Sequence, residues 1–247
     1  MRSSVRSLRA ALDPVVLARE SGLQPDGWQE RVLRSGSARM LLNCSRQSGK
    51  STTVGILAAH RALYAPRSLV LLLSPTLRQS GELFAKTRAV LPIRPEKESA
   101  LSLEMANGSR VVSLPGTEKT VRGFSGVDLL IVDEASRVAD DLVAAIRPML
   151  AVSSGKLVML STPWGKRGTF FREWTEGEGW ERYRITAEQC PRISVDFLEE
   201  ERRNLGDRWF KQEYMCSFEE TEDSVFASDA IAMAIDPTIA PLFGGVA

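Results

Sequence analysis

The sequence contains few residues of the kinds that build metal centres or disulfide frameworks. Its 247 residues include one histidine, His60, and three cysteines, Cys44, Cys190 and Cys216. The cysteines show neither the paired spacing of a zinc site nor that of a disulfide framework, which suits a reducing compartment. We expect His60, within a helical pattern, to be structural rather than a ligand.

The chain also lacks an excess of charge and a long apolar run. With 32 Lys and Arg against 31 Asp and Glu, the net charge is +1, so any nucleic-acid-binding surface must be local. No apolar run approaches the roughly 20 residues of a membrane-spanning helix, so we expect no membrane partner. Hydrophobic content of 43% is ordinary for a globular protein, and 247 residues suffice for one α/β domain with a small appendage.

What the chain does contain is a phosphate-binding loop. The segment Cys44–Ser51 (CSRQSGKS) follows the apolar run Arg39–Asn43 and fits G-x-x-x-x-G-K-[ST], except that Cys44 replaces the first glycine. In such a loop the backbone N–H groups and the following helix N-terminus face nucleotide phosphates. Gly49 lets the backbone approach closely, because it has no Cβ. We expect Lys50 to reach the β- and γ-phosphates and Ser51 to bind Mg²⁺. The residues expected to hold the phosphates are Ser45, Arg46, Gln47, Ser48, Gly49, Lys50, Ser51 and Thr52.

A second motif supplies the acids that such a loop needs. The apolar run Val127–Val132 ends in Asp133 and Glu134. A buried strand that delivers an acid at its C-terminal end suits a Mg²⁺ ligand, and we assign that role to Asp133. Glu134 is then placed to orient a water for attack on the γ-phosphate. Taken singly, Lys50 could be a surface lysine and the acidic pair a helix cap, but together the motifs predict a site for nucleotide and Mg²⁺.

Strands and helices are expected to alternate along the chain, which indicates a parallel α/β sheet. The expected strands are Arg39–Asn43, Ser68–Ser74, Val127–Val132 and Lys156–Leu160, and the expected helices cover about 7–20, 28–33, 50–64, 77–91 and 139–150. The pair Asn107-Gly108 predicts a hairpin between Leu101–Met105 and Arg110–Leu114.

The pattern changes beyond about residue 178. Trp180–Ile185 alternates as an exposed strand would, charge-rich helices are expected at about 194–204 and 207–213, and Tyr214–Phe218 could form one more strand. We therefore expect an ATPase core with a helical lead-in over 1–178 and a smaller lid or linker subdomain over 179–226. The tail, 227–247, is expected to be poorly ordered or to begin a further domain.

The set of motifs, in this order, resembles the large-subunit packaging ATPase, or terminase, of tailed bacteriophages over about residues 20–226. These motors use the loop form Arg46–Ser51 and commonly lack its first glycine. The other matching segments are Pro25-x-x-Trp28-Gln29 (adenine recognition), Leu129–Ala135 (second motif), Ser161-Thr162-Pro163 (coupling motif), and Gln212–Tyr214 with Ser224–Phe226 (end of the ATPase domain).

The resemblance implies a P-loop NTPase of the additional-strand, RecA-like type, with a mainly parallel sheet flanked by helices and a small C-terminal lid subdomain. It implies that Gln29 contacts adenine, although Gln29 could instead simply open an amphipathic helix. The hydroxyls of Ser161 and Thr162 would lie beside the γ-phosphate and sense its loss, if strand 156–160 lies between the P-loop and Asp133 strands. The alternative is a plain strand end.

Arginine and lysine residues outside the loop are further candidates. Arg122 lies in a glycine-punctuated loop, and in related motors an arginine before glycine here enters the neighbouring subunit's site as a finger. The alternative is a solvated loop arginine. Lys166 and Arg167 are rival trans-acting candidates, or they grip DNA phosphates. Arg46 has no acid near it in sequence, and its place in the loop aims it at phosphate or at a neighbouring acid.

The function implied is Mg²⁺-dependent ATP hydrolysis that drives double-stranded DNA into a viral procapsid. The implied partners are DNA, further copies of the chain in a homo-oligomeric ring, a portal protein and a small terminase subunit, in the cytoplasm of an infected or lysogenic bacterial host. Because only residues 227–247 follow Phe226, we expect no nuclease activity from this chain. Two alternatives remain open: a helicase-like DNA-dependent ATPase, which should carry a second RecA-like domain, and a nucleotide-binding scaffold without turnover, which has no need of Glu134.

Overall fold

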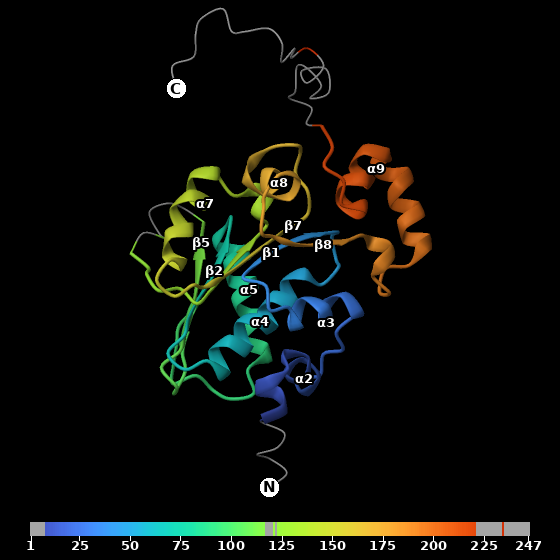
Figure 1. The fold of residues 1–247 in the computed structure, drawn as a ribbon. Helices are drawn as coiled ribbons and strands as arrows, with labels where there is room; N and C mark the ends of the chain where they lie inside the picture. Colours follow the sequence, from blue (N-terminus) through green and yellow to red (C-terminus); the bar gives the residue numbers. More distant parts are fainter. Residues whose placement is uncertain (1–7, 117–120, 122, 221–233, 235–247) are drawn as a thin grey trace, which may run out of the picture.

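One twisted sheet forms the centre of the molecule. The structure is a computed structural model that describes residues 8–116, 121, 123–220 and 234. Within these residues an eight-stranded sheet has the order β3-β4-β5-β2-β6-β7-β1-β8 (Figure 1). Its strands are β1 (Arg39–Cys44), β2 (Leu69–Ser74), β3 (Lys97–Glu98), β4 (Ser102–Glu104), β5 (Arg110–Pro115), β6 (Leu129–Asp133), β7 (Lys156–Ser161) and β8 (Glu181–Ile185).

The strands that carry the two motifs do not pair with each other. β7 pairs in parallel with β1 on one side and with β6 on the other, so it is the additional strand between them. The expected position of strand 156–160 is thereby confirmed. Because the three strands are parallel, the carboxyl ends of β1, β7 and β6 lie at the same edge of the sheet. The hairpin at Asn107-Gly108 is also confirmed, since β4 and β5 pair antiparallel and Gly108 has a φ of 79°.

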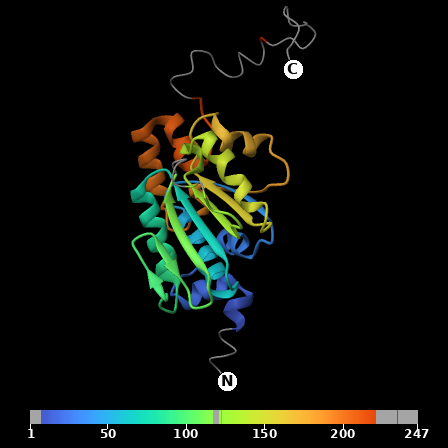
Figure 2. The same cartoon turned by 90° about the vertical axis from the view of Figure 1, so that its left-hand side faces the viewer.

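Helices cover both faces of the sheet, as Figures 1 and 2 show. One face packs against α2 (Pro14–Glu20), α3 (Gly27–Arg34), α4 (Lys50–Tyr64) and α5 (Leu77–Val90), and the other against α7 (Asp140–Ile146) and α8 (Gly168–Thr175). Alternate residues of β1 serve alternate faces: Met40 and Leu42 lie in the first core, and Leu41 lies in the second. Burial of each such aliphatic side chain contributes roughly 1.5–3 kcal/mol, which accounts for the nearly continuous apolar strands.

Two expected helices are interrupted where the backbone demands it. The first expected helix breaks at Asp13, because Pro14 has no N–H to donate; instead Asp13 Oδ1 accepts from Val15 N at 2.9 Å and caps α2. The expected helix at 139–150 ends as α7 at Ile146 and continues as the 3₁₀ helix η2 (Arg147–Leu150) around Pro148.

The C-terminal part differs from expectation in two ways. The predicted strand Tyr214–Phe218 is wrong: helix α9 (Val195–Met215) runs through Tyr214, which packs with Ala187, Leu198 and Phe210 in a small separate core. The two expected helices are confirmed as the two parts of α9, which are separated at Gly206, whose φ of 76° is non-helical. Strand β8 pairs with β1 in the main sheet, although the division predicted at residue 178 assigns it to the subdomain.

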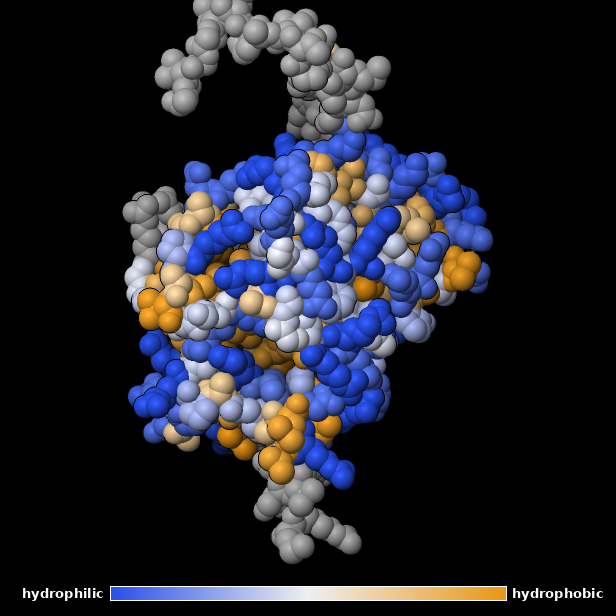
Figure 3. Space-filling view, in the orientation of Figure 1, coloured by the Kyte–Doolittle hydropathy of each residue, from blue (hydrophilic) through white to orange (hydrophobic). Residues whose placement is uncertain are grey.

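On the face shown in Figure 3, hydrophilic residues predominate and apolar side chains appear in separate areas. Among the residues that the structure describes, no helix combines the length and the apolar character needed to cross a membrane.

Candidate nucleotide site

The P-loop connects the buried end of β1 to the first turn of α4. Two of its residues adopt the left-handed conformation, Gln47 with a φ of 59° and Gly49 with a φ of 92°. A Cβ on Gly49 would lie 3.0 Å from Gln29 Nε2, so both the conformation and the space favour glycine. Within the described part of the chain, no backbone N–H from Gln47 to Ser51 donates a hydrogen bond. These groups remain available for phosphate oxygens. Cys44, in place of the first glycine, is fully buried.

The serine of the loop meets the acid of the second motif directly. Ser51 Oγ donates to Asp133 Oδ2 at 3.1 Å, although β7 separates the strands β1 and β6 that lead to these two residues. Two oxygens at adjacent corners of an octahedral Mg²⁺ ion lie about 2.9 Å apart, given Mg–O distances of about 2.1 Å. The pair therefore fits Mg²⁺ in both donor type and spacing.

Burial and neighbouring charges shift the pKa values of Asp133 and Lys50. Asp133 is 6% exposed, and burial together with the neighbouring Glu134 charge raises its pKa to about 6. Burial alone would lower the pKa of Lys50, but the carboxylates of Glu134 and Asp133 outweigh it and raise that pKa. The site thus holds a buried cation beside two acids, a combination that is costly without a ligand and typical of functional sites.

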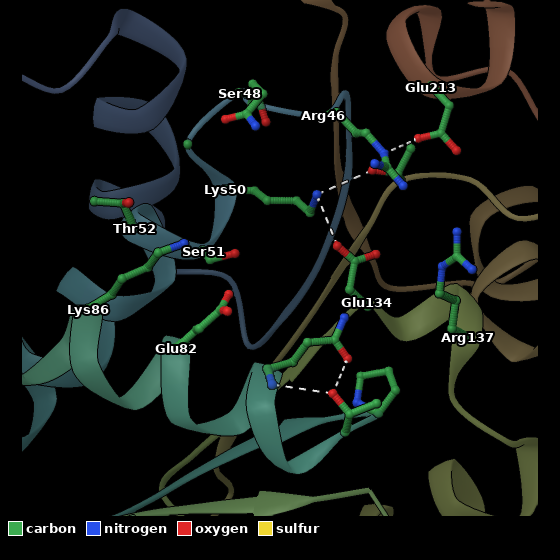
Figure 4. A pocket seen from close by; sticks show the side chains of 16 residues that line it. Arg46, Ser48, Lys50, Ser51, Thr52, Glu82, Lys86, Glu134, Arg137 and Glu213 are labelled. Carbon is green, nitrogen blue, oxygen red and sulfur yellow. Dashed lines mark hydrogen bonds and ion pairs between the residues drawn. The ribbon is translucent and has the colours of Figure 1, made fainter. Parts of the chain in front are cut away.

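Ser161 and Thr162 lie against Lys50 and Glu134, the two side chains whose ion pair Figure 4 marks with a dashed line. Lys50 Nζ lies 3.2 Å from Glu134 Oε1 and donates to Thr162 Oγ1 at 3.2 Å. Ser161 Oγ lies within donating distance of Glu134 Oε2, at 3.4 Å, and also donates to the Thr162 carbonyl at 2.7 Å. The structure therefore brings together the loop, the acidic pair and the Ser161-Thr162 pair, as the sequence predicts.

Two adjoining cavities meet at the start of α4. The first, about 760 Å³, is lined by the P-loop, by Glu134 and Thr162, and by residues of α5. The second, about 610 Å³, is lined by residues 22–26, Gln29, Ile56, Pro191 and Arg192. Gly49 and Thr52 line both cavities. The first cavity is polar and suits phosphates, whereas the second is walled by Leu23, Pro25 and Ile56 and suits a base. We call them the phosphate cavity and the base cavity.

Gln29 lines the second cavity, but its amide also has a structural task. Its Oε1 accepts from Asp26 N at 2.8 Å, which completes the capping box of α3, and its Nε2 donates to Thr53 Oγ1 at 2.9 Å. These bonds fix α3 against α4 and hold the amide at the boundary between the two cavities.

Comparisons with known proteins place this site in a family. A profile of the family described as "Terminase large subunit, T4likevirus-type, N-terminal" matches residues 41–233. The chain belongs to this family of terminase large subunits. It is 29% identical over 232 residues to the terminase large subunit of Escherichia phage T5, covering 85% of this chain and 51% of that protein. The chain thus spans about half the length of the curated relative it matches.

Solved terminases share the fold. The large terminase ATPase domain of Thermus phage P74-26 superposes with a TM-score of 0.72 at 22% identity, covering 82% of this chain and 97% of that one. The large terminase of a thermophilic bacteriophage in complex with ATP-γ-S gives a TM-score of 0.65 at 14% identity, covering 78% of this chain and 52% of that one. The additional-strand P-loop fold expected from the sequence is confirmed.

Sequence reasoning missed Arg192 and the role of Glu213, which it had placed only in the segment Gln212–Tyr214 at the end of the ATPase domain. Arg46 Nε lies 2.5 Å from Glu213 Oε2, so the loop arginine faces an acid at the end of α9. Arg192 donates to Asp26 Oδ1 at 2.9 Å and to the Ser48 carbonyl at 3.0 Å, which ties the base cavity to the P-loop. Both contacts join residues far apart in the chain, and no local pattern signals them.

Of the remaining candidates, Lys166 and Arg167 are not brought into the cavity. Arg122 lies outside the described residues. Lys166 Nζ pairs with Glu220 Oε1 at 3.0 Å, and Arg167 precedes α8 as its N-cap. Neither Lys166 nor Arg167 is among the described residues that line the phosphate cavity. His60 has the structural role expected of it, because its ring contacts the Ala10 carbonyl at 3.1 Å and Tyr64.

Proposed function

We propose that this chain hydrolyses ATP to drive double-stranded DNA into a viral procapsid. The observation that carries the proposal is the 3.1 Å contact of Ser51 Oγ with Asp133 Oδ2, beside the 3.2 Å contact of Lys50 Nζ with Glu134 Oε1. A Mg²⁺-bound triphosphate under attack by water requires these four groups at one point.

Each residue has a defined task in the hydrolysis. The free N–H groups of the P-loop hold the phosphates. Ser51 and Asp133 would hold Mg²⁺, which when bound neutralises charge on the β- and γ-phosphate oxygens. Glu134 orients a water against the γ-phosphate and accepts its proton. Since Lys50 lies within ion-pair distance of Glu134, a phosphate that binds Lys50 would compete with that carboxylate and free it for the water.

The residues around this centre extend the mechanism to the base, to a neighbouring subunit and to the C-terminal part. Gln29 contacts the adenine from the wall of the second cavity. Arg122 of a neighbouring copy completes the charge stabilisation, so full activity requires a homo-oligomeric ring. Ser161 and Thr162 report phosphate loss to the α9 subdomain, whose movement displaces DNA. Their bonds to Lys50 and Glu134 support this assignment.

Family membership supports the partners that we propose. Double-stranded DNA is the substrate that is moved, and a portal protein and a small terminase subunit position the ring on the procapsid. The site of action is the cytoplasm of the bacterial host.

A phosphate-release assay with and without double-stranded DNA tests the proposal. We expect wild-type turnover to require Mg²⁺, Lys50→Ala to abolish nucleotide binding and turnover, and Glu134→Gln to reduce turnover at least about 100-fold while still binding ATP. Lys97→Ala, an exposed lysine on the far edge strand β3, is the matched control and should retain activity. Normal turnover by Glu134→Gln would refute the role of Glu134.

The same assay, together with a strand-separation assay on a labelled duplex, distinguishes the two alternatives. A scaffold would bind ATP and release no phosphate in the presence of DNA. A helicase-like ATPase would separate the strands of a labelled duplex, whereas a packaging motor moves along the duplex intact.

A further inference from the structure

Among the described residues, four cationic and three acidic side chains line the phosphate cavity, and the acids are Glu82, Glu134 and Glu213. The cationic residues that line it, among those described, are Arg46, Lys50, Lys86 and Arg137. Arg46 faces Glu213 and Lys50 faces Glu134, each within ion-pair distance. A magnesium-bound triphosphate brings net negative charge, so the two remaining cations are the candidates for additional phosphate contacts.

Of these two, Arg137 lies nearer the reacting end of the nucleotide. Figure 4 shows its side chain rising beside Glu134, whereas Lys86 lies on α5 near Thr52 and Glu82. Within the described part of the chain, Arg137 forms no ion pair. Its guanidinium Cζ instead lies 3.8 Å from the centroid of the Trp164 ring, a cation–π contact.

The backbone that carries Arg137 is held firmly to the active-site strands. The 3₁₀ helix η1 (Ala135–Arg137) has Glu134 as its N-cap. The left-handed backbone of Glu134 (φ 50°) turns the chain sharply before the helix. Ser136 N donates to Ser161 Oγ at 3.2 Å, and Ser136 Oγ donates to the Thr162 carbonyl at 2.7 Å. Arg137 is therefore anchored beside the Lys50–Thr162 contact, while its exposed side chain is free to change partner.

We propose that Arg137 is a catalytic arginine supplied in cis, which leaves Trp164 and contacts the γ-phosphate of ATP bound in the same chain. This inference depends on the proposed ATP site. A guanidinium–phosphate hydrogen bond is charge-assisted and stronger than an exposed cation–π contact, so the exchange of partners is favourable. Because ADP has no γ-phosphate, Arg137 distinguishes ATP from ADP. This task differs from that implied for Arg122, which acts on a neighbouring subunit.

Binding of two nucleotides tests the inference without reference to turnover. Dissociation constants for Mg²⁺–ATP-γ-S and Mg²⁺–ADP are measured by calorimetry for the wild type, Arg137→Ala, Arg137→Lys and Arg110→Ala. We expect Arg137→Ala to weaken ATP-γ-S binding about tenfold and to change ADP binding less than about twofold. Arg137→Lys should recover part of the loss, because the charge remains. Arg110, exposed at the opposite end of the sheet on β5, is the matched control and should behave as wild type.

Several outcomes would overturn the inference. Unchanged binding of ATP-γ-S, or an equal loss for both nucleotides, would show that Arg137 does not contact the γ-phosphate. Loss of DNA affinity with unchanged nucleotide binding would place Arg137 on a DNA-binding surface instead. Recovery of Arg137→Ala turnover on mixing with Glu134→Gln chains would contradict action in cis. If the wild type binds neither nucleotide, the proposed function itself fails, which is a separate result.

Discussion

Asp133 is the residue at which the needs of binding and of stability conflict. In the proposed site it must be a carboxylate to hold Mg²⁺ with Ser51, yet burial and the charge of Glu134 raise its pKa to about 6. The folded chain therefore binds this proton more tightly than the unfolded chain, in which the pKa is near its ordinary 3.8. Stability consequently falls as pH rises from about 4 to about 6, and the full cost of the buried charge remains above that range.

We therefore predict that Asp133→Asn stabilises the nucleotide-free protein at pH 8 by about 1–3 kcal/mol, because it removes a buried charge. The gain should shrink at pH 4.5, where Asp133 is already protonated. Thermal denaturation at both pH values measures it, and Asp141→Asn on the exposed surface of α7 is the control. Asp133→Asn should also lose the stabilisation that Mg²⁺–ADP gives the wild type. A lower melting temperature at pH 8 would show that the carboxylate stabilises the apo fold.

Other residues show how far local sequence reaches. Lys50, Ser51, Asp133 and Glu134 are placed as predicted, because their positions at strand ends follow from short motifs next to apolar runs. The acid opposite Arg46 could not be identified from sequence, because Glu213 is 167 positions away and meets the loop only after α9 has folded.

At the scale of elements, β7 determines the spacing of the site. It separates β1 from β6 and carries Ser161 between the two motifs. The turn that leads into it is tightly packed at Gly155, where a Cβ would lie 2.0 Å from the Val127 carbonyl oxygen and 2.8 Å from Leu150 Cδ2. Both neighbours are fixed, since Val127 precedes β6 and Leu150 ends η2.

Gly155→Ala should accordingly destabilise the protein by about 1–3 kcal/mol, through displacement of backbone rather than of a flexible side chain. Urea denaturation followed by circular dichroism measures the change. Gly36→Ala is the matched control: no atom lies within 4 Å of its Cβ position and its φ is not positive, so its stability should change by less than about 1 kcal/mol. Equal stabilities for the two variants would contradict the packing argument.

The elements predicted correctly are those with strong periodicity and clear boundaries, such as β1, β2, α4 and α5. The failures occur where local signals are weak. Tyr214–Phe218 has strand-like composition, but Tyr214 is buried against Leu198 and Phe210 and remains in helix α9, which ends at Met215. In the N-terminal helix, Pro14 interrupts a pattern that is otherwise continuous.

At the scale of the whole molecule, the site is lined by residues from the first third of the chain together with residues from the C-terminal third. β8 extends the sheet beside β1, and the segment after it brings Arg192 to Asp26 and Ser48. The end of α9 is fastened to the same region, since Asn43 Nδ2 donates to the Cys216 carbonyl at 3.0 Å. The base cavity is therefore complete only when the segments around Asp26 and Arg192 are both in place.

We predict that Arg192→Ala weakens ADP binding about 3–10-fold, because the wall of the base cavity and the Ser48 carbonyl lose their common partner. Calorimetry measures the affinity, and the melting temperature without nucleotide shows whether the fold is intact. Arg172→Ala removes another exposed arginine that pairs with an aspartate, Asp140, away from the cavity, and it should bind ADP as the wild type does. Identical affinities for the two variants would remove Arg192 from the site.

The sequence by itself determined the P-loop, the acidic pair and the alternation of strands and helices, because each depends on neighbouring residues and on burial patterns that a short segment encodes. Only the tertiary structure decided which side chains complete the site. Glu213 and Arg192 reach it through contacts between distant segments, which form when the sheet and its two apolar faces bring those segments together. Arg137 directly follows the acidic pair, and the bonds of Ser136 to Ser161 and Thr162 hold its backbone beside the site. The fold class could thus be predicted from periodicity, whereas the charge balance of the cavity required the packed molecule.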